Sequence, residues 1–161
     1  MALHETAVFA AQKPTRANPS RLSPQLSSSG SVEFAVIKYT LKGTEVAGEF
    51  VNLAVLPAGA IPLPQLSGIS CGADPASGVF TVDIGTAADT QGWADGVNIA
   101  AGGHVTAISA GAVTWLEPTP LVADVGFENS GSAVVSAKLD TLAGPTAGVN
   151  LYFLLAYKLA R

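Results

Sequence analysis

The sequence predicts an all-β fold, a jelly-roll-like antiparallel β-sandwich with an extended N-terminal arm. Short apolar, β-branched runs follow one another from residue 32 onward. Glycines lie near the ends of these runs, where turns need unusual backbone angles or tight spacing. No amphipathic helix of four turns is visible. Connections of differing length favour a jelly roll or a related Greek-key sandwich over a regular meander.

Residues 1–31 differ from the rest of the chain, and we divide it into an arm (1–31) and a sandwich body (32–161). Three prolines disfavour a helix through 14–24, because each removes a backbone donor and restricts the residue before it. Residues 3–12 are compatible with a short helix or strand once they meet a surface, and the serines of 27–31 read as a joint. Two interpretations stay open: a disordered tail, or an arm that orders on a neighbouring subunit. The basic residues of the arm are Lys13, Arg16 and Arg21.

The body contains ten segments that read as strands. In the first, alternation places Phe34, Val36 and Lys38 on one face. The opposite face then carries Ile37 and Tyr39. The ten segments are 32–41, 49–56, 60–63, 66–71, 79–84, 104–109, 112–116, 121–127, 133–139 and 150–158.

Three other segments carry more specific expectations. The run 49–56 has little polarity on either face, so we expect a central strand covered on both sides. Strict alternation in 79–84 places Asp83 on one side and Phe80 on the other. The long connection 86–102 has room for a helical turn at 89–94, with Asp89 as its N-cap.

Charge is scarce and unevenly distributed. Hydrophobic residues make up 48% of the chain and charged residues 12%, about half the usual share. No lysine or arginine occurs from 43 to 137, whereas nine carboxylates do. The net charge of −4 argues against a nucleic-acid partner, which would need a basic face. So few charges would hardly cover the surface of a monomer, and we expect part of that surface to be buried in a homo-oligomer.

The single cysteine, Cys71, excludes an intrachain disulfide and a cysteine-rich metal site. We expect it to be a small buried apolar residue of a chain that folds in a reducing cytoplasm. No run approaches the roughly 20 apolar residues that span a bilayer, and no signal peptide is visible, so we expect a soluble chain with no membrane partner.

Catalytic constellations are missing from the sequence. A nucleophilic triad needs a histidine between an acid and a hydroxyl or thiol. The two histidines are His4, in the arm, and His104, and they are too few for a cupin-type metal site. We therefore predict no enzyme activity, no cofactor and no metal.

Two sets of residues could each have either a ligand-binding role or an ordinary structural role. Four aspartates could hold a calcium ion, although their spacing does not match an EF-hand and loop carboxylates are usually turn formers. Trp93 and Trp115 could stack on sugars, although such residues more often fill a core or a subunit interface. The aspartates are Asp74, Asp83, Asp89 and Asp95.

Several blocks of the body resemble a group of small structural proteins of tailed bacteriophages. The blocks span residues 40 to 158 and leave out the arm. They are 51–60 (VNLAVLPAGA), 82–85 (VDIG), 93–96 (WADG), 101–103 (AGG) and 146–157 (TAGVNLYFLLAY).

The resemblance implies a virion protein of the capsid decoration (cement) type, a β-sandwich that is often trimeric. It would be made in the host bacterial cytoplasm and sit on the capsid exterior, bound to the major capsid protein. The residues we expect at capsid or subunit contacts are Lys13, Arg16, Arg21, Trp93 and Trp115. Two alternatives remain: a carbohydrate-binding module of a head or tail fibre, and an enzyme acting on cell-wall or capsule polymer.

Overall fold

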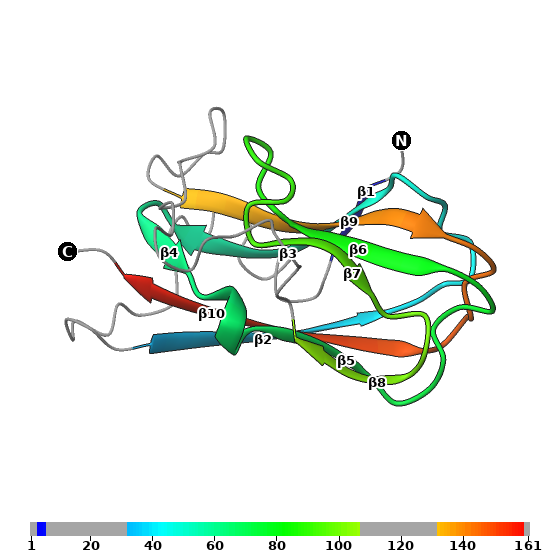
Figure 1. The fold of residues 1–161 in the computed structure, drawn as a ribbon. Helices are drawn as coiled ribbons and strands as arrows, with labels where there is room; N and C mark the ends of the chain where they lie inside the picture. Colours follow the sequence, from blue (N-terminus) through cyan, green and yellow to red (C-terminus); the bar gives the residue numbers. More distant parts are fainter. Residues whose placement is uncertain (1–2, 6–31, 107–131, 160–161) are drawn as a thin grey trace, which may run out of the picture.

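A computed structural model describes residues 3–5, 32–106 and 132–159 of the chain. These residues form two facing β-sheets with one short 3-10 helix, as Figure 1 shows. The elements are β1 (Leu3–Glu5), β2 (Val32–Thr40), β3 (Phe50–Pro57), β4 (Ala60–Pro62), η1 (Pro64–Leu66), β5 (Gly68–Cys71), β6 (Phe80–Gly85), β7 (Ala94–Asn98), β8 (Gly103–Thr106), β9 (Ser132–Leu142) and β10 (Asn150–Leu159).

The prediction of an all-β sandwich is confirmed. One sheet has the order β1-β3-β9-β6-β7, and the other has the order β2-β10-β5-β8 with β4 also paired to β10. Most neighbours within a sheet are distant in the chain, as in Greek-key sandwiches. β1 runs parallel to β3, whereas all the other described strand pairs are antiparallel.

The core lies between the sheets and takes alternate residues from strands such as β2, β9 and β10. In β2, Ile37 and Tyr39 are buried, whereas Phe34 and Val36 point outward, as the alternation predicts. All six inner positions of β3 are buried, so the prediction of a strand covered on both faces is confirmed. The largest fully buried side chains are Trp93, Phe80, Phe153, Ile37, Leu41, Leu53, Ile69, Ile84, Ile99, Leu139, Leu151 and Leu155.

The predicted helical turn at 89–94 is confirmed only as a single turn. Residues 90–91 form a turn that Gly92 N–H closes on the Asp89 carbonyl at 3.3 Å, and the Asp89 carboxylate caps it by accepting a hydrogen bond from Gln91 N–H at 3.1 Å. The Asp89 carbonyl also accepts a bond from Thr86 N–H at 2.8 Å. No helix follows this turn, and the chain continues into β7.

The start of the chain is described only at β1, whose backbone pairs Leu3 with Phe50 and Glu5 with Asn52. The rest of 1–31 and the predicted strands 112–116 and 121–127 lie outside the described residues. The division of the chain at residue 31 therefore stays a prediction.

Candidate functional site

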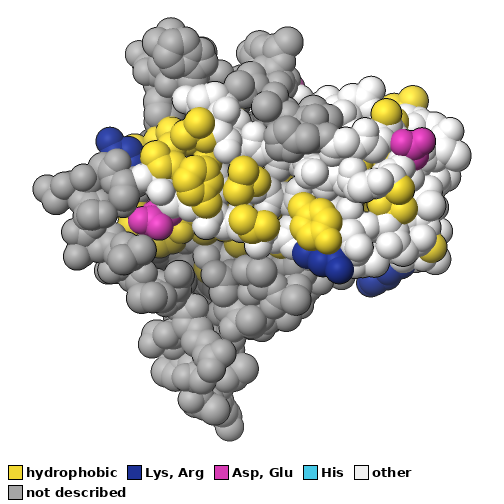
Figure 2. Space-filling view, turned by 90° about the horizontal axis from the view of Figure 1, so that it is seen from below, with side chains coloured by type: hydrophobic (Ala, Val, Ile, Leu, Met, Phe, Trp, Pro, Cys, Tyr) yellow, Lys and Arg dark blue, Asp and Glu magenta, His cyan; other side chains and the backbone are white. Residues whose placement is uncertain are grey.

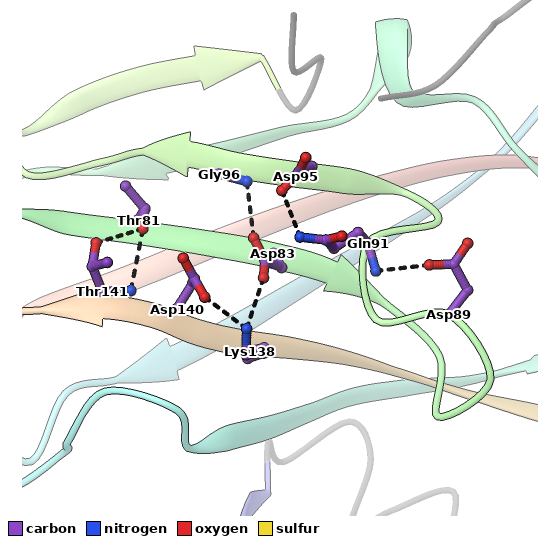
Figure 3. Close-up of polar contacts among 9 residues, drawn as sticks. All are labelled: Thr81, Asp83, Asp89, Gln91, Asp95, Gly96, Lys138, Asp140 and Thr141. Carbon is purple, nitrogen blue, oxygen red and sulfur yellow. Dashed lines mark hydrogen bonds and ion pairs between the residues drawn. The ribbon is translucent and has the colours of Figure 1, made fainter. Parts of the chain in front are cut away.

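The outer face of the β3–β9–β6–β7 sheet carries polar side chains that bond to one another. Lys138 on β9 lies between two carboxylates, 3.2 Å from Asp83 on β6 and 2.6 Å from Asp140 (Figure 3). Asp83 is fully buried, and its other oxygen accepts a 2.8 Å hydrogen bond from Gly96 N–H on β7. This carboxylate thereby links three adjacent strands.

Lys138 is held in its charged form. Its pKa lies above the ordinary lysine value, first because of the hydrogen bond to Asp140 and then because of Asp83, while burial acts in the opposite direction. A lysine whose pKa is raised is a poor nucleophile and a poor general base at neutral pH. The cluster is therefore suited to holding strands together and unsuited to acid–base or covalent chemistry.

Neutral pairs continue the same face. Ser136 on β9 donates to the Asn52 side-chain oxygen on β3 at 2.7 Å. The hydroxyls of Thr81 and Thr141 share a hydrogen bond between β6 and β9 (Figure 3). Cross-strand pairs of this kind stabilise a sheet. They also leave few polar atoms of this face without a hydrogen-bond partner that a ligand could supply.

The four aspartates considered for calcium do not come together. Asp74 accepts a bond from Gly102 N–H at 2.8 Å, and Asp95 accepts one from the Gln91 side chain at 2.7 Å. Asp83 and Asp89 have the separate partners given above. In the part of the chain that the structure describes, no three His, Cys, Asp or Glu side chains form a group that could hold a metal ion.

Trp93 lies in the core and not at the surface position considered for it. Its side chain is fully buried, and its indole N–H donates to the Ser67 hydroxyl at 3.0 Å. The same hydroxyl accepts a bond from Ala156 N–H at 3.0 Å and donates to the Leu63 carbonyl at 2.9 Å. Trp93 therefore offers no surface to a sugar, a capsid protein or a sister subunit; it joins the two sheets through Ser67.

A second buried polar group, Glu45, fixes the loop between β2 and β3. Its carboxylate accepts bonds from Tyr39 O–H at 2.8 Å, Lys42 N–H at 2.7 Å and Gly43 N–H at 2.9 Å. Burial opposes its ionisation, but these hydrogen bonds prevail and lower its pKa. Burial, together with the bond to Glu45, raises the pKa of Tyr39. Neither group is accessible to a substrate.

The outer face of the β2–β10 pair is different, because it exposes apolar side chains. Phe34 is 55% exposed, Val36 65% and Tyr152 42%. Figure 2, which looks onto the sandwich from below, shows hydrophobic side chains gathered along this face, with both basic and acidic side chains beside them. We call the outward positions of these two strands the outward array: Val32, Phe34, Val36 and Lys38 on β2 with Tyr152, Leu154, Ala156 and Lys158 on β10.

The remaining predicted contact residues cannot be located. Lys13, Arg16, Arg21 and Trp115 lie outside the described residues, so their roles stay predictions. Cys71 is free and buried, as expected.

Sequence reasoning missed both Ser67 and Glu45. Ser67 carries no local signal, since Trp93 and Ala156 are 26 and 89 residues away. The partners of Glu45 lie within six residues of it, so a carboxylate that closes this loop was a local signal that we overlooked.

No described helix is long and apolar enough to cross a membrane. No protein-family model matches the chain, and comparison with curated proteins gives no significant match.

Two solved structures share the fold. One, described as the capsid of Ralstonia phage GP4, contains a chain with a TM-score of 0.67 and 23% identity, and the match covers 99% of both chains. The other, described as the capsid asymmetric unit of cyanophage Pam1, contains a chain with a TM-score of 0.57 and 16% identity. That match covers 91% of this chain and 97% of the other. At these identities the likeness shows a common fold.

Proposed function

We propose that this chain is a non-enzymatic structural protein of a bacteriophage capsid. The observation that carries the proposal is the fold, which is similar over almost the whole length to a chain from the capsid of Ralstonia phage GP4. A second capsid structure, from cyanophage Pam1, has a chain of similar fold and extent. The described polar groups also support a structural role, because they bond to one another and hold strands together.

Within the capsid, the chain acts as a decoration (cement) protein. It binds the shell of the major capsid protein on the outside of the particle, as a homotrimer, after synthesis in the host bacterial cytoplasm. Many copies on a repeating shell turn weak single contacts into strong retention. The resemblance of the sequence blocks to small phage structural proteins favours this role over that of the shell protein itself.

The arm, residues 1–31, serves as an anchor. Its three cations, Lys13, Arg16 and Arg21, would pair with acidic patches on the shell or on a sister copy. The pairing of β1 with β3 supports the idea, because the start of the chain is able to add a strand to a sheet edge.

Binding to particles tests the proposal. Particles assembled without this chain are mixed with the purified full chain, pelleted and imaged by electron microscopy. We expect saturable binding at a repeating position on the exterior and a particle that withstands higher temperature. Particles that bind no copies would contradict the decoration role.

Deleting residues 1–24 tests the anchor. We expect a folded body, by circular dichroism, that occupies particles poorly. A matched variant with Lys13, Arg16 and Arg21 all changed to Gln separates charge from length. Unchanged occupancy of the deletion variant would remove the anchoring role and leave the decoration role intact.

A further inference from the structure

The outward array has a defined geometry. Across the antiparallel β2–β10 pair, Phe34 lies opposite Ala156 and Val36 opposite Leu154. Directly opposed residues point to the same side of a sheet, so these four side chains share one face. Phe34 and Val36 are exposed on it and Leu154 partly so, whereas Ala156 is buried. Among the described strands, β2 is the last of its sheet, and the apolar surface therefore reaches the edge of the described sheet.

Such a surface is costly to leave in water. In an antiparallel sheet with one solvated face, outward positions are ordinarily polar. Here Phe34 and Val36 expose more than half of their surface. A contiguous apolar patch of this kind marks a contact with another molecule.

Charge indicates what kind of molecule covers it. Lysines occupy two diagonally opposite corners of the array: Lys38 lies opposite Tyr152, and Lys158 lies opposite Val32. The two rows are six positions apart along β2, a span of about 20 Å. Both lysines are exposed, and none of the eight outward positions is a carboxylate.

This charge pattern disfavours packing of the array against the same array of a second copy. Two facing arrays would bury four lysines over uncharged corners of the array, and none of the outward positions supplies a carboxylate to balance them. A partner that is apolar in the middle would cover the apolar side chains of the array. Carboxylates at two separated points of that partner would pair with Lys38 and Lys158.

We propose that the outward array is the surface by which this chain docks on the capsid shell, which presents an apolar surface flanked by carboxylates. The inference rests on the proposed function and names the face that performs it. Phe34, Val36 and Tyr152 are desolvated against the shell protein, and Lys38 and Lys158 pair with its acidic groups. The polar face of the opposite sheet then points away from the contact.

A pair of matched double variants tests the docking. F34T/V36T removes the apolar surface but keeps β-branched, strand-compatible residues. V46T/V79T also replaces two exposed apolar residues with threonine, at positions outside the array that are 58% and 56% exposed. We expect the first variant to bind particles at least about tenfold more weakly than the unchanged chain, and the second to bind normally.

The lysines give an independent readout. K38E and K158E should each weaken particle binding several-fold, with the loss largest at low salt, where charge pairing is least screened. These variants carry the test if F34T/V36T does not fold.

Each outcome has one meaning. No binding by the unchanged chain contradicts the proposed function. Normal binding by the unchanged chain, F34T/V36T and K38E overturns the docking face and leaves the function standing. Loss of the oligomer in F34T/V36T without particles, with V46T/V79T unaffected, would show that a sister copy covers the array and would also overturn the proposal.

Discussion

The two outer faces of the sandwich are built from strands of the same alternating kind, yet one carries paired polar side chains and the other carries exposed apolar ones. On the β3–β9–β6–β7 face, Lys138 pairs with both Asp83 and Asp140, and Ser136 bonds to Asn52. On the β2–β10 face, aromatic and branched side chains are exposed to solvent. Most polar groups of the first face therefore have partners within the described chain, the buried Ser132 hydroxyl being an exception. The second face exposes apolar side chains that another molecule could cover.

The difference teaches where stability and binding reside. Removing a group from the polar face leaves its partners unsatisfied, which costs folding free energy. Removing an exposed apolar group costs the isolated chain little, because that group is already in water. Substitutions should therefore separate the two faces cleanly, and the interior on which both faces depend should be the most sensitive.

The largest effect is expected from Ser67→Ala, in the interior between the faces. Two buried donors, Trp93 Nε1–H and Ala156 N–H, lose their acceptor. We expect the free energy of unfolding to fall by about 3 kcal/mol in urea denaturation. Ser70→Ala, at a half-buried position on β5, serves as the control and should change it by less than about 0.5 kcal/mol. Equal effects would mean that Ser67 is not the link between the sheets.

Asp83→Ala should break the polar face. It removes one of the two carboxylates beside Lys138 and the acceptor of Gly96 N–H. Since Lys138 keeps Asp140 and is partly exposed, we expect a loss of about 2 kcal/mol in the free energy of unfolding. Asp95→Ala, a half-buried carboxylate bonded to a side chain at the surface, should cost far less. If Asp83→Ala left the free energy of unfolding unchanged, the contrast between the two faces would be contradicted.

Glu45→Gln sharpens the comparison through pH. The folded pKa of Glu45 lies below its ordinary value of 4.5, so its charge stabilises the fold above that pH. This contribution is lost as the pH falls through the folded pKa. We expect the variant to be about 1 kcal/mol less stable at pH 7, and this difference to shrink as the pH is lowered through the folded pKa. A difference that stays the same as the pH is lowered would assign the effect to packing.

The smallest effect on stability is expected on the apolar face. F34T/V36T should change the free energy of unfolding by less than about 0.5 kcal/mol, because both side chains are mainly exposed and threonine favours strands. Thermal and urea unfolding check this. A large destabilisation would mean that the apolar face supports the fold as well as any contact.

Sequence reasoning predicted which side chains share a face of a strand. It could not predict which of these side chains have partners within the chain. Alternation in 32–41 correctly placed Phe34 and Val36 opposite Ile37 and Tyr39. The same argument separated Asp83 from Phe80, but it could not reveal that Asp83 is buried, because its partner Lys138 is 55 residues away. A period-two pattern predicts on which side of a strand a side chain lies. Which other side chains it meets there depends on strands that are distant in the sequence.

Two features could not be predicted, for the same physical reason. Asp89 caps a single turn, but no helix follows, because the loop approaches β6 so closely that a Cβ at Gly85 would overlap the Asp89 carbonyl oxygen. The chain therefore continues as β7. Trp93, placed at a contact surface, is instead buried and bonded to Ser67, which directly precedes β5 of the other sheet. Neither close approach is visible in a local segment of sequence.

The position of β10 has a consequence for how copies are made. This late strand lies between β2 and β5, so a nascent chain that lacks residues 150–159 leaves β2 without its described neighbour and β5 paired with β8 alone. Half of the outward array also comes from β10. The sheet that carries the array can therefore close only after nearly the whole chain has been synthesised.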